Sequence, residues 1–435
     1  MNLAGIALAF LLPLGVMMAA WGGLPPEHSK RAASAGLFAL ALATLTYATA
    51  GFAFQFGGIW HMTQLDAYRS LDQFWSVPDP TGNTWSVTGL AGFMFAGSLG
   101  PEALGLFLHQ LPMVMTAVLI PVLALAGRVH NLVLTVIGLT VGLFISPLVG
   151  HWVWAGGWLA TLGQNLRLGH GYVDVAGAGA IYLSGSLLAL LGLLLFAKPR
   201  APQENPPRLP EAHLPLLAVA GSVVFALGWT AWIAGDPFHP ASASLNVPLA
   251  LVNGFLAASA ATLVTQLFSW FASSHVDPLM ATRGWLSGWV IASAAAPFIE
   301  PSSALILGVF AGLLTPLMMY VLDRLAHLDD ATAAVSVYGL PGLLGALAVG
   351  IFADGRWGAG WNGIGAKEYL LVKGQGITGQ LPADAFVVDS GQLTAQLAGA
   401  GAIVVFTLVV GGIVMLVTHL VVCWWPRKTP VPRAE

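Results

Sequence analysis

An aspartate and a tyrosine recur at one spacing in two apolar stretches of the chain. Asp174 precedes Tyr182 by eight residues, and the run YLSGSLLALLG begins there. Asp330 precedes Tyr338 by eight residues, and the run YGLPGLLGALA begins there. A carboxylate at the start of a helix accepts hydrogen bonds from the unpaired N–H groups, and a phenol can donate and accept hydrogen bonds. The two copies predict an internal repeat.

The composition places these residues in a lipid bilayer. Hydrophobic residues make up 57% of the chain and charged residues only 8%, whereas soluble domains carry about 25% charged residues. The net charge of -3 and the lack of a basic block exclude a nucleic-acid partner. The single cysteine, Cys423, excludes an intramolecular disulfide and a cysteine metal cluster. No hydrolase, zinc-protease or phosphate-loop motif is present, so we expect neither an enzyme nor a cofactor.

Apolar runs of about 20 residues, enough to cross about 30 Å of hydrocarbon, predict an all-α integral membrane protein with eleven transmembrane helices. A Pro-rich, charged linker, KPRAPQENPPRLPEAH, separates the fifth helix from the sixth. The opening stretch lacks a basic segment and a cleavage site, so we interpret it as the first membrane helix. The predicted helices are Leu3–Trp21, Ala33–Phe54, Leu104–Leu125, Leu132–Ala155, Val173–Phe196, Leu214–Ala234, Val247–Phe271, Trp285–Phe298, Ser303–Val321, Ala331–Phe352 and Gln392–Trp424.

The positive charges predict the orientation of these helices. Of the sixteen lysines and arginines, eleven fall on one side of this arrangement and five on the other, which puts the N-terminus outside and the C-terminus inside. The first block contains five helices, an odd number, so the second block of five begins on the opposite side of the membrane. The second block therefore runs inverted with respect to the first. The membrane domain, 1-425, is then repeat one at about 1-198, repeat two at about 212-353 and a final helix at about 392-425, before a short cytoplasmic tail, 426-435.

Inverted repeats bring their equivalent helices together near the middle of the membrane. Tyr182 and Tyr338 should each lie about 12 Å along their helices, at about 1.5 Å per residue. We therefore expect the two phenols to approach one another from opposite sides at the centre of the bundle.

Over nearly its whole length the chain resembles the ammonium transporter family, the Amt, Mep and Rh proteins. The matching features are HWVWAGGWLA before the fifth helix, the Asp-Val-Ala-Gly that opens it, LGWTAWIAGD at the end of the sixth, Asn253 in the seventh, and an Asp-Asp pair followed by VYG where the family has VHG. The resemblance implies eleven helices with an outer N-terminus, a multi-pass protein of the cell (plasma or inner) membrane, and a homotrimer with a pore in each subunit.

Several residues depart from the pattern of the family. The family's two pore histidines form a hydrogen-bonded pair, and Tyr182 and Tyr338 stand at those positions. Histidine, with a pKa of about 6.5, suits a proton relay, whereas tyrosine, near 10, stays neutral. At the external site that recruits ammonium, Trp154 keeps the family's tryptophan. By the same resemblance, Asp236 replaces a serine of that site, and Met113 and Trp232 replace the two stacked gate phenylalanines.

Three of the polar residues near this path have two interpretations each. Asp236 either attracts a cation beside the tryptophans, with a cation–π contact worth about 0.5 to 2 kcal/mol, or is a solvated acid or cap at a helix end. Asp174 either caps its helix or helps a passing cation. His109, within the third helix, either faces the pore and substitutes for the lost relay or pairs with a backbone carbonyl.

Two functions follow from these residues. The first is transport of ammonium, ammonia or a related small amine or cation, with Asp236, Trp154, Trp232 and Met113 at the entrance and Tyr182, Tyr338, His109 and Asp174 along the pore. The second is a non-transporting sensor or structural homologue that binds ammonium. No output domain follows the last helix, which favours the transporter. The long regulatory tail of many bacterial family members is also missing, which puts control by a PII signalling protein in doubt.

Overall fold

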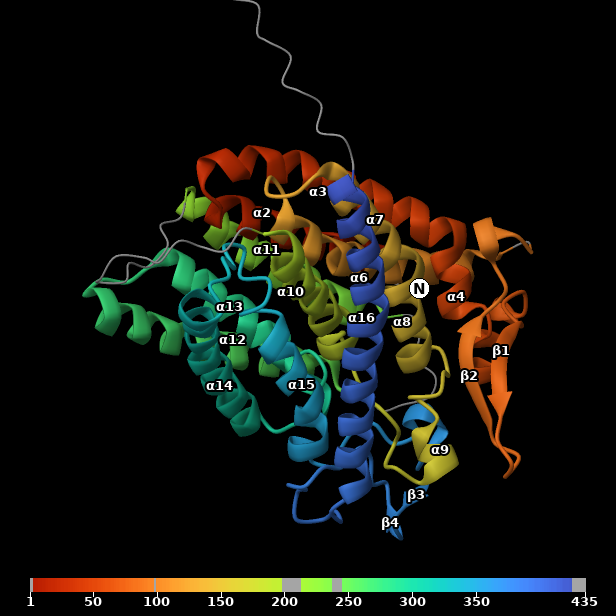
Figure 1. Cartoon of the computed structure of the whole chain (residues 1–435). Coiled ribbons are helices and arrows are strands. Elements are labelled where there is room, and N and C mark those ends of the chain that lie inside the picture. Colours follow the sequence, from red (N-terminus) through yellow and green to blue (C-terminus); the bar gives the residue numbers. More distant parts are fainter. Residues whose placement is uncertain (1–2, 98, 198–212, 237–244, 425–435) are drawn as a thin grey trace, which may run out of the picture.

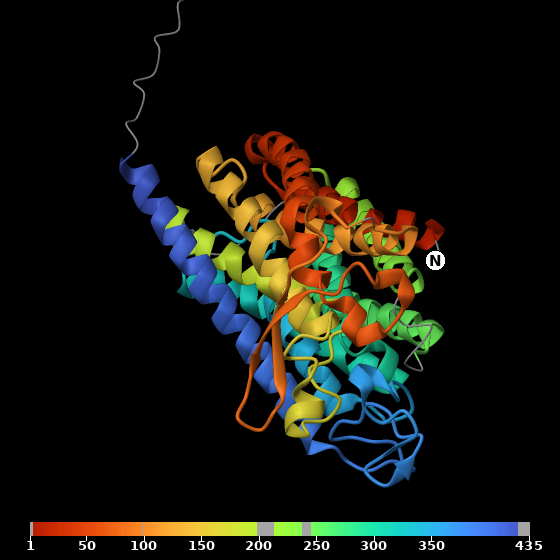
Figure 2. The ribbon, with the colours of Figure 1, turned by 90° about the vertical axis from the view of Figure 1, so that its right-hand side faces the viewer.

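The fold is a bundle of apolar helices with short strands and loops at one end (Figure 1). The computed structural model describes residues 3–97, 99–197, 213–236 and 245–424. Most of the predicted linker, 198–212, and the predicted tail, 426–435, lie outside the described residues. Figures 1 and 2 together show the long α16 (Ser390–Trp424) running along one side of the bundle.

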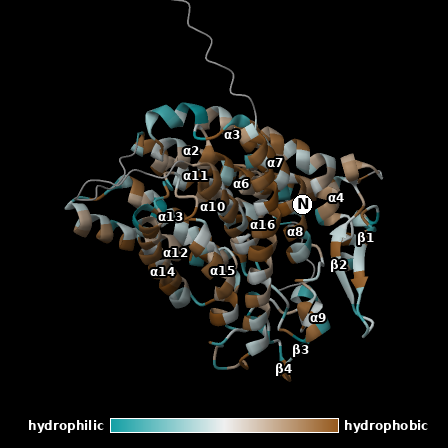
Figure 3. Ribbon diagram, in the orientation of Figure 1, coloured by the Kyte–Doolittle hydropathy of each residue, from teal (hydrophilic) through white to brown (hydrophobic). Residues whose placement is uncertain are grey.

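In the described part of the chain, nine segments are long and apolar enough to cross a membrane. Figure 3 shows largely hydrophobic ribbon along them and a hydrophilic start of α3. Two shorter helices, α13 (Pro278–Ala292) and α15 (Gly339–Phe352), stand at the eighth and tenth positions of the predicted series. The nine segments are built from α1 (Leu3–Ala9) with α2 (Leu11–Gly23), α3 (Pro26–Thr46) with α4 (Phe52–Phe56), α6 (Pro101–Leu125), α7 (Asn131–Thr140) with α8 (Ser146–Trp154), α10 (Ser184–Phe196), α11 (Pro215–Ala234), α12 (Val247–Ser273), α14 (Pro301–Tyr320) and α16.

The predicted helical membrane class is confirmed, while the count of eleven spans, the inverted repeats, the outer N-terminus and the domain boundaries stay predictions. Two predicted starts are wrong. The second helix begins at Pro26 rather than Ala33, because proline and an acidic Glu27 suit a first helical turn. The eighth runs Pro278–Ala292 rather than Trp285–Phe298, because the Asp277 carboxylate accepts hydrogen bonds from the first backbone N–H groups.

The fifth and tenth helices also begin later than predicted. A π-helical turn, Ala178–Leu183, starts the segment that was placed from Val173, and α15 starts at Gly339 rather than Ala331. The residues between each aspartate and its helix wrap around the carboxylate instead. Gly177 and Ala333 take positive φ angles of 78° and 56° in these turns, where only glycine is unstrained.

Helices α2 and α11, the first long helices of the two predicted repeats, pack backbone to backbone. A Cβ atom on Gly15 would collide with the backbone of Phe225, and one on Gly228 would collide with the backbone of Leu12. Small residues allow membrane helices to approach this closely, which increases their van der Waals contact. The two predicted repeats therefore meet along glycine contacts.

Two short hairpins, which the sequence analysis missed, lie outside the helices. One pairs β1 (Phe74–Pro78) with β2 (Thr84–Gly89), and the other pairs β3 (Glu368–Tyr369) with β4 (Val372–Lys373). The Asp79 carboxylate closes the first turn by accepting from Thr81, and hydrogen bonding, first of all from the Thr81 side chain, lowers the pKa of Asp79 to about 2. The short helices α5 (Ile59–Thr63) and α9 (Leu162–Leu166) complete the loops around these hairpins.

The first hairpin is fastened to α8. The side chain of His151 lies 2.7 Å from the Ser86 hydroxyl and 2.7 Å from the Gln55 carbonyl oxygen. The neighbouring Trp152 donates from Nε1 to the carbonyl of Val87 at 2.9 Å. These contacts fix the end of α8, which carries Trp154, against the hairpin.

Candidate functional site

The two repeated aspartates cap the segments that lead to the tyrosines. The Asp174 carboxylate accepts hydrogen bonds from the backbone N–H groups of Ala178, Gly179 and Ala180 at 2.7 to 2.9 Å. The Asp330 carboxylate accepts from the N–H of Val335 at 3.2 Å and from the N–H and hydroxyl of Ser336 at 2.9 and 2.8 Å.

Both carboxylates therefore do what the capping interpretation expects. The same kind of cap thus stands eight residues before each of the two tyrosines.

Tyr182 and Tyr338 come together as predicted. Their ring centroids are 5.9 Å apart and their planes differ by 19°, so the rings stack. Tyr182 lies four residues into the segment that starts at Ala178, and Tyr338 directly precedes α15. The predicted depth of about 12 Å along a helix, at about 1.5 Å per residue, is therefore wrong for both. Phe225 of α11 adds a third ring, 6.0 Å from Tyr182.

The tyrosine pair is enclosed by protein. Tyr182 has no exposed surface and Tyr338 is 4% exposed. The Tyr182 hydroxyl makes no hydrogen bond of ordinary geometry among the described residues, although Ser293 stands near enough to influence it. Buried hydroxyls normally have a partner, and Ser293 is the side chain placed to provide one.

Three of the predicted residues form an aromatic cluster on α6, α8 and α11. The indole of Trp232 stacks on the ring of His109, with centroids 4.7 Å apart, and its Nε1 donates to the His109 carbonyl at 3.0 Å. Trp154 lies 6.4 Å from Trp232 and donates from Nε1 to the carbonyl of Asp174 at 2.6 Å. The cluster is therefore tied to the segment that carries Tyr182.

Met113 and Asp236 complete the set of predicted residues. Met113 is fully buried on α6, about one helical turn beyond His109. Asp236 follows the end of α11, where it and Glu102 act electrostatically on Tyr68. The pKa of Tyr68 is raised, first by its burial and then by these two carboxylates. Tyr68 and Glu102 were not predicted, and the approach of Asp236 to the tryptophans stays a prediction.

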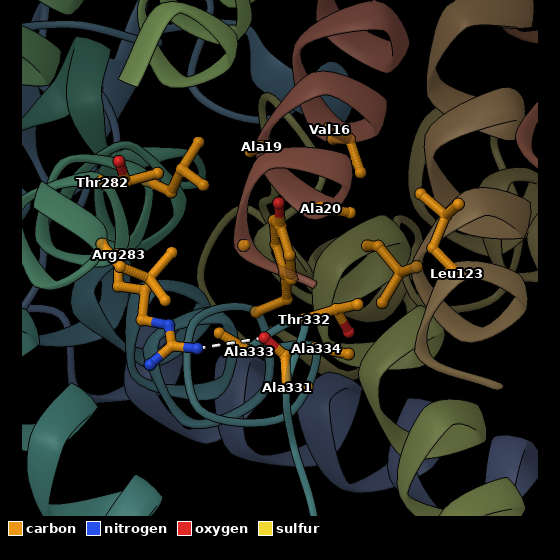
Figure 4. A pocket seen from close by; sticks show the side chains of 15 residues that line it. Val16, Ala19, Ala20, Leu123, Thr282, Arg283, Ala331, Thr332, Ala333 and Ala334 are labelled. Carbon is orange, nitrogen blue, oxygen red and sulfur yellow. Dashed lines mark hydrogen bonds between the residues drawn. The ribbon is translucent and has the colours of Figure 1, made fainter. Parts of the chain in front are cut away.

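A small cavity lies against Tyr338 between α2, α6, α13 and the segment before α15 (Figure 4). Its volume of about 20 Å³ admits one water-sized molecule. The walls are mostly small or aliphatic, including Ala19, Ala20 and Leu123, but Arg283 and Thr332 also line it.

Sequence reasoning did not place Arg283 beside this cavity, because it assigned the residue to a loop ahead of the eighth helix. The signal available was a lone arginine within an apolar helix.

Helix α16 holds the chain just ahead of Asp174. Gln392 accepts a hydrogen bond from the N–H of His170 at 2.8 Å and donates to the carbonyl of Gly171 at 2.9 Å. Gln396, one turn further, accepts from the N–H of Val173 and donates to its carbonyl, both at 2.8 Å. Gln396 also donates to the carbonyl of Ala346 in α15.

The chain matches the family model described as Ammonium Transporter Family over residues 1–424. Among curated proteins, the ammonium transporter Amt2 of Archaeoglobus fulgidus is 31% identical over 300 residues, 67% of this chain and 62% of that protein. The ammonium transporter Amt1 of Methanocaldococcus jannaschii is 30% identical over 234 residues, 52% of this chain and 55% of that protein. The matched regions thus span less than two thirds of these relatives.

Solved structures share the fold. A protein described as Sensor Amt Protein superposes with a TM-score of 0.73 at 22% identity, covering 98% of this chain and 93% of that one. Mep2 of Candida albicans superposes with a TM-score of 0.74 at 19% identity, covering 98% of this chain and 85% of that one. At these identities the likeness establishes the architecture alone.

Proposed function

Because this chain belongs to the ammonium transporter family, we propose that it carries ammonium or ammonia across the membrane through a pore in each subunit. Family membership and the apolar helices make it a multi-pass protein of the cell membrane. The family is one of transporters, not of enzymes. The substrate and the route through this chain are therefore what the proposal adds.

The observation that carries the proposal is the buried, stacked pair of Tyr182 and Tyr338. These residues stand at the positions of the family's relay histidines. A bare charge in the centre of a bilayer costs several kcal/mol, and a phenol with a pKa near 10 does not exchange protons readily at neutral pH. We therefore infer that the substrate passes the two rings as neutral ammonia, with the phenols as hydrogen-bonding partners.

The entrance follows from the aromatic cluster. Trp154, Trp232 and His109 are joined by ring contacts and hydrogen bonds, and aromatic faces attract cations. We propose that Asp236 raises the local concentration of ammonium there and that Met113 stands between this cluster and the tyrosines. Asp174 then acts through its cap, by positioning the segment of Tyr182.

The arrangement in the membrane belongs to the same proposal. Eleven spans and an outer N-terminus agree with the charge asymmetry of the loops. The homotrimer is proposed from membership of the family, and the inverted repeats are placed at about 1-198 and 212-353. The repeated acid caps and the glycine contacts between α2 and α11 support the repeats.

Ammonia uptake by proteoliposomes tests the proposal. Neutral ammonia that enters a vesicle binds a proton there, so a pH-sensitive dye in the lumen should report a faster alkalinisation than in empty liposomes. Asp236→Ala should raise the half-saturating ammonium concentration about fivefold, since a coulombic attraction of roughly 1 kcal/mol is lost. The matched control is Asp79→Ala, in the turn of the first hairpin.

The result that would count against transport is alkalinisation equal to that of empty liposomes. Quenching of tryptophan fluorescence by ammonium in such a silent protein would then favour the alternative function, a non-transporting ammonium sensor. An unchanged half-saturating concentration in Asp236→Ala would remove Asp236 from the entrance and leave transport itself intact.

A further inference from the structure

A buried arginine lies beside the cavity that adjoins Tyr338. Arg283 belongs to the second turn of α13, and only 3% of it is exposed. Figure 4 shows its side chain on one side of the cavity, with the guanidinium directed toward Ala331. Among the described residues that line the cavity it is the only charged one.

The guanidinium is held by neutral groups. Nη2 donates to the carbonyl of Ala331 at 3.0 Å, and Nη1 lies 3.4 Å from the sulfur of Met319. Nε has no hydrogen-bond partner among the described residues, and Arg283 forms no ion pair within 4.0 Å in that part of the chain. No carboxylate of the described residues therefore contacts the guanidinium where it meets the cavity.

Three carboxylates act on Arg283 from further away, those of Asp330, Asp277 and Asp329. Each is bound by other groups. Asp330 accepts from the N–H groups that follow it, Asp277 caps the start of α13, and Asp329 forms an ion pair with Arg128 at 3.1 Å. None of the three lines the cavity, so Arg283 is the one charged side chain on the cavity wall among the described residues.

We propose that Arg283 is the selectivity-determining residue at the inner end of the pore, where its positive charge excludes cations from the cavity next to Tyr338 and admits neutral ammonia. The cavity admits one water-sized molecule, so a cation there would have no hydration shell to screen it from the guanidinium. Charges interact strongly in such low-dielectric surroundings, and an arginine can act as an electrostatic barrier to cations in a narrow pore. This inference rests on the proposed transport of ammonia.

The test compares charge with ammonia moved by the full-length protein in proteoliposomes. Luminal alkalinisation measures ammonia, and capacitive current on a solid-supported membrane measures charge. Arg283→Gln and Arg283→Met remove the charge, and Arg283→Lys keeps it. Each change is made with the native tyrosines and also with Tyr182→His and Tyr338→His, so that a barrier at the phenols cannot hide one at the arginine.

In the histidine background, we expect the ratio of charge to ammonia moved to be about tenfold or more higher in the neutral variants than in their parent. The reason is that a unit charge is removed from a low-dielectric site. Arg283→Lys should stay at the ratio of its parent. Arg31→Gln is the matched control: Arg31 donates to the carbonyl of Gly127 and does not line the cavity. It should also keep the ratio of its parent.

Two outcomes overturn the inference while transport stands. One is that ammonia uptake persists and the ratio of charge to ammonia moved is unchanged, in both neutral variants and in both backgrounds. The other is an equal rise in Arg31→Gln, which would mean that the ratio responds to the loss of any arginine and not to the charge at the cavity. If the native protein takes up no ammonia at all, the proposed function fails and this inference fails with it.

Discussion

At the scale of single residues, the chemistry depends on what a phenol can do in place of an imidazole. Tyr182 and Tyr338 stack in a buried site, where they offer hydrogen bonds. The ordinary pKa of tyrosine lies about 3.5 units above that of histidine. A relay must release its proton near the working pH. The pair should therefore let ammonia pass without the accompanying proton, so that ammonia moves without charge.

The paired change Tyr182→His and Tyr338→His should create an ammonium-evoked current. Imidazoles exchange protons near neutral pH, so we expect the current to rise about tenfold or more above that of the native protein, with luminal alkalinisation retained. The matched control is Tyr182→Phe with Tyr338→Phe, which keeps the two rings but lacks any titratable group. Current in the phenylalanine pair equal to that in the histidine pair would refute a relay.

Much of the site was predictable from the sequence at this scale, because identity and spacing carry it. The Asp-Tyr repeat led to the stacked tyrosines, and the motif residues Trp154 and Trp232 were found together with His109. Arg283 was not predicted as part of the site. Its role depends on which way one helical face points, and the misplaced start of α13 assigned it to a loop.

At the scale of elements, the main surprise is how the helices begin. Hydropathy predicts where an apolar run lies but not which backbone groups a neighbouring carboxylate captures. Asp174 and Asp330 bind N–H groups four to six residues ahead, so the chain loops around them before a helix can form. The periodicity of a sequence does not reveal that a side chain competes with the helix for these backbone groups.

Helix α16 fixes the first of these turns through Gln396. Replacing it by the similar-sized leucine should leave the backbone N–H and carbonyl of Val173 buried without partners. Each such group costs about 1 to 3 kcal/mol, so Gln396→Leu should lower the thermal unfolding temperature in detergent by several degrees.

The control for this change is Thr394→Ala, a surface position on the same helix whose hydroxyl bonds only within α16. It should leave the unfolding temperature unchanged. An equal shift in both variants would mean that the glutamine contributes no more than local helix stability.

At the scale of the whole molecule, distant loops close over one end of the bundle. His170 is buried there, against the ring of Tyr369, with centroids 4.8 Å apart. The Tyr369 hydroxyl in turn donates to the Asp389 carboxylate at 2.9 Å. Neither ring nitrogen of His170 has a hydrogen-bond partner among the described residues, and burial lowers the pKa of His170 to about 4.

This histidine should make the protein less stable in acid. The unfolded chain binds a proton near pH 6.5 and the folded chain only near pH 4. The folded state therefore loses stability as the pH falls through that window, by up to about 3 kcal/mol. Unfolding in detergent at pH 7 and pH 4.5 should show a smaller loss for His170→Phe than for the native protein.

His275→Phe, at an exposed loop position, provides the comparison for His170. It should keep the acid sensitivity of the native protein. If His170→Phe keeps that sensitivity as well, the destabilisation in acid comes from other groups.

The contacts of α16 also bear on the order in which the protein is made. Chains fold from the N-terminus during synthesis, and Gln396 leaves the ribosome more than two hundred residues after Val173, which it holds. It also binds Ala346, from the second predicted repeat. The turn that leads to Tyr182 therefore cannot form its hydrogen bonds to Gln396 until α16 has been synthesised. A nascent chain stalled before α16 should contain its earlier membrane segments but lack the final structure of this turn.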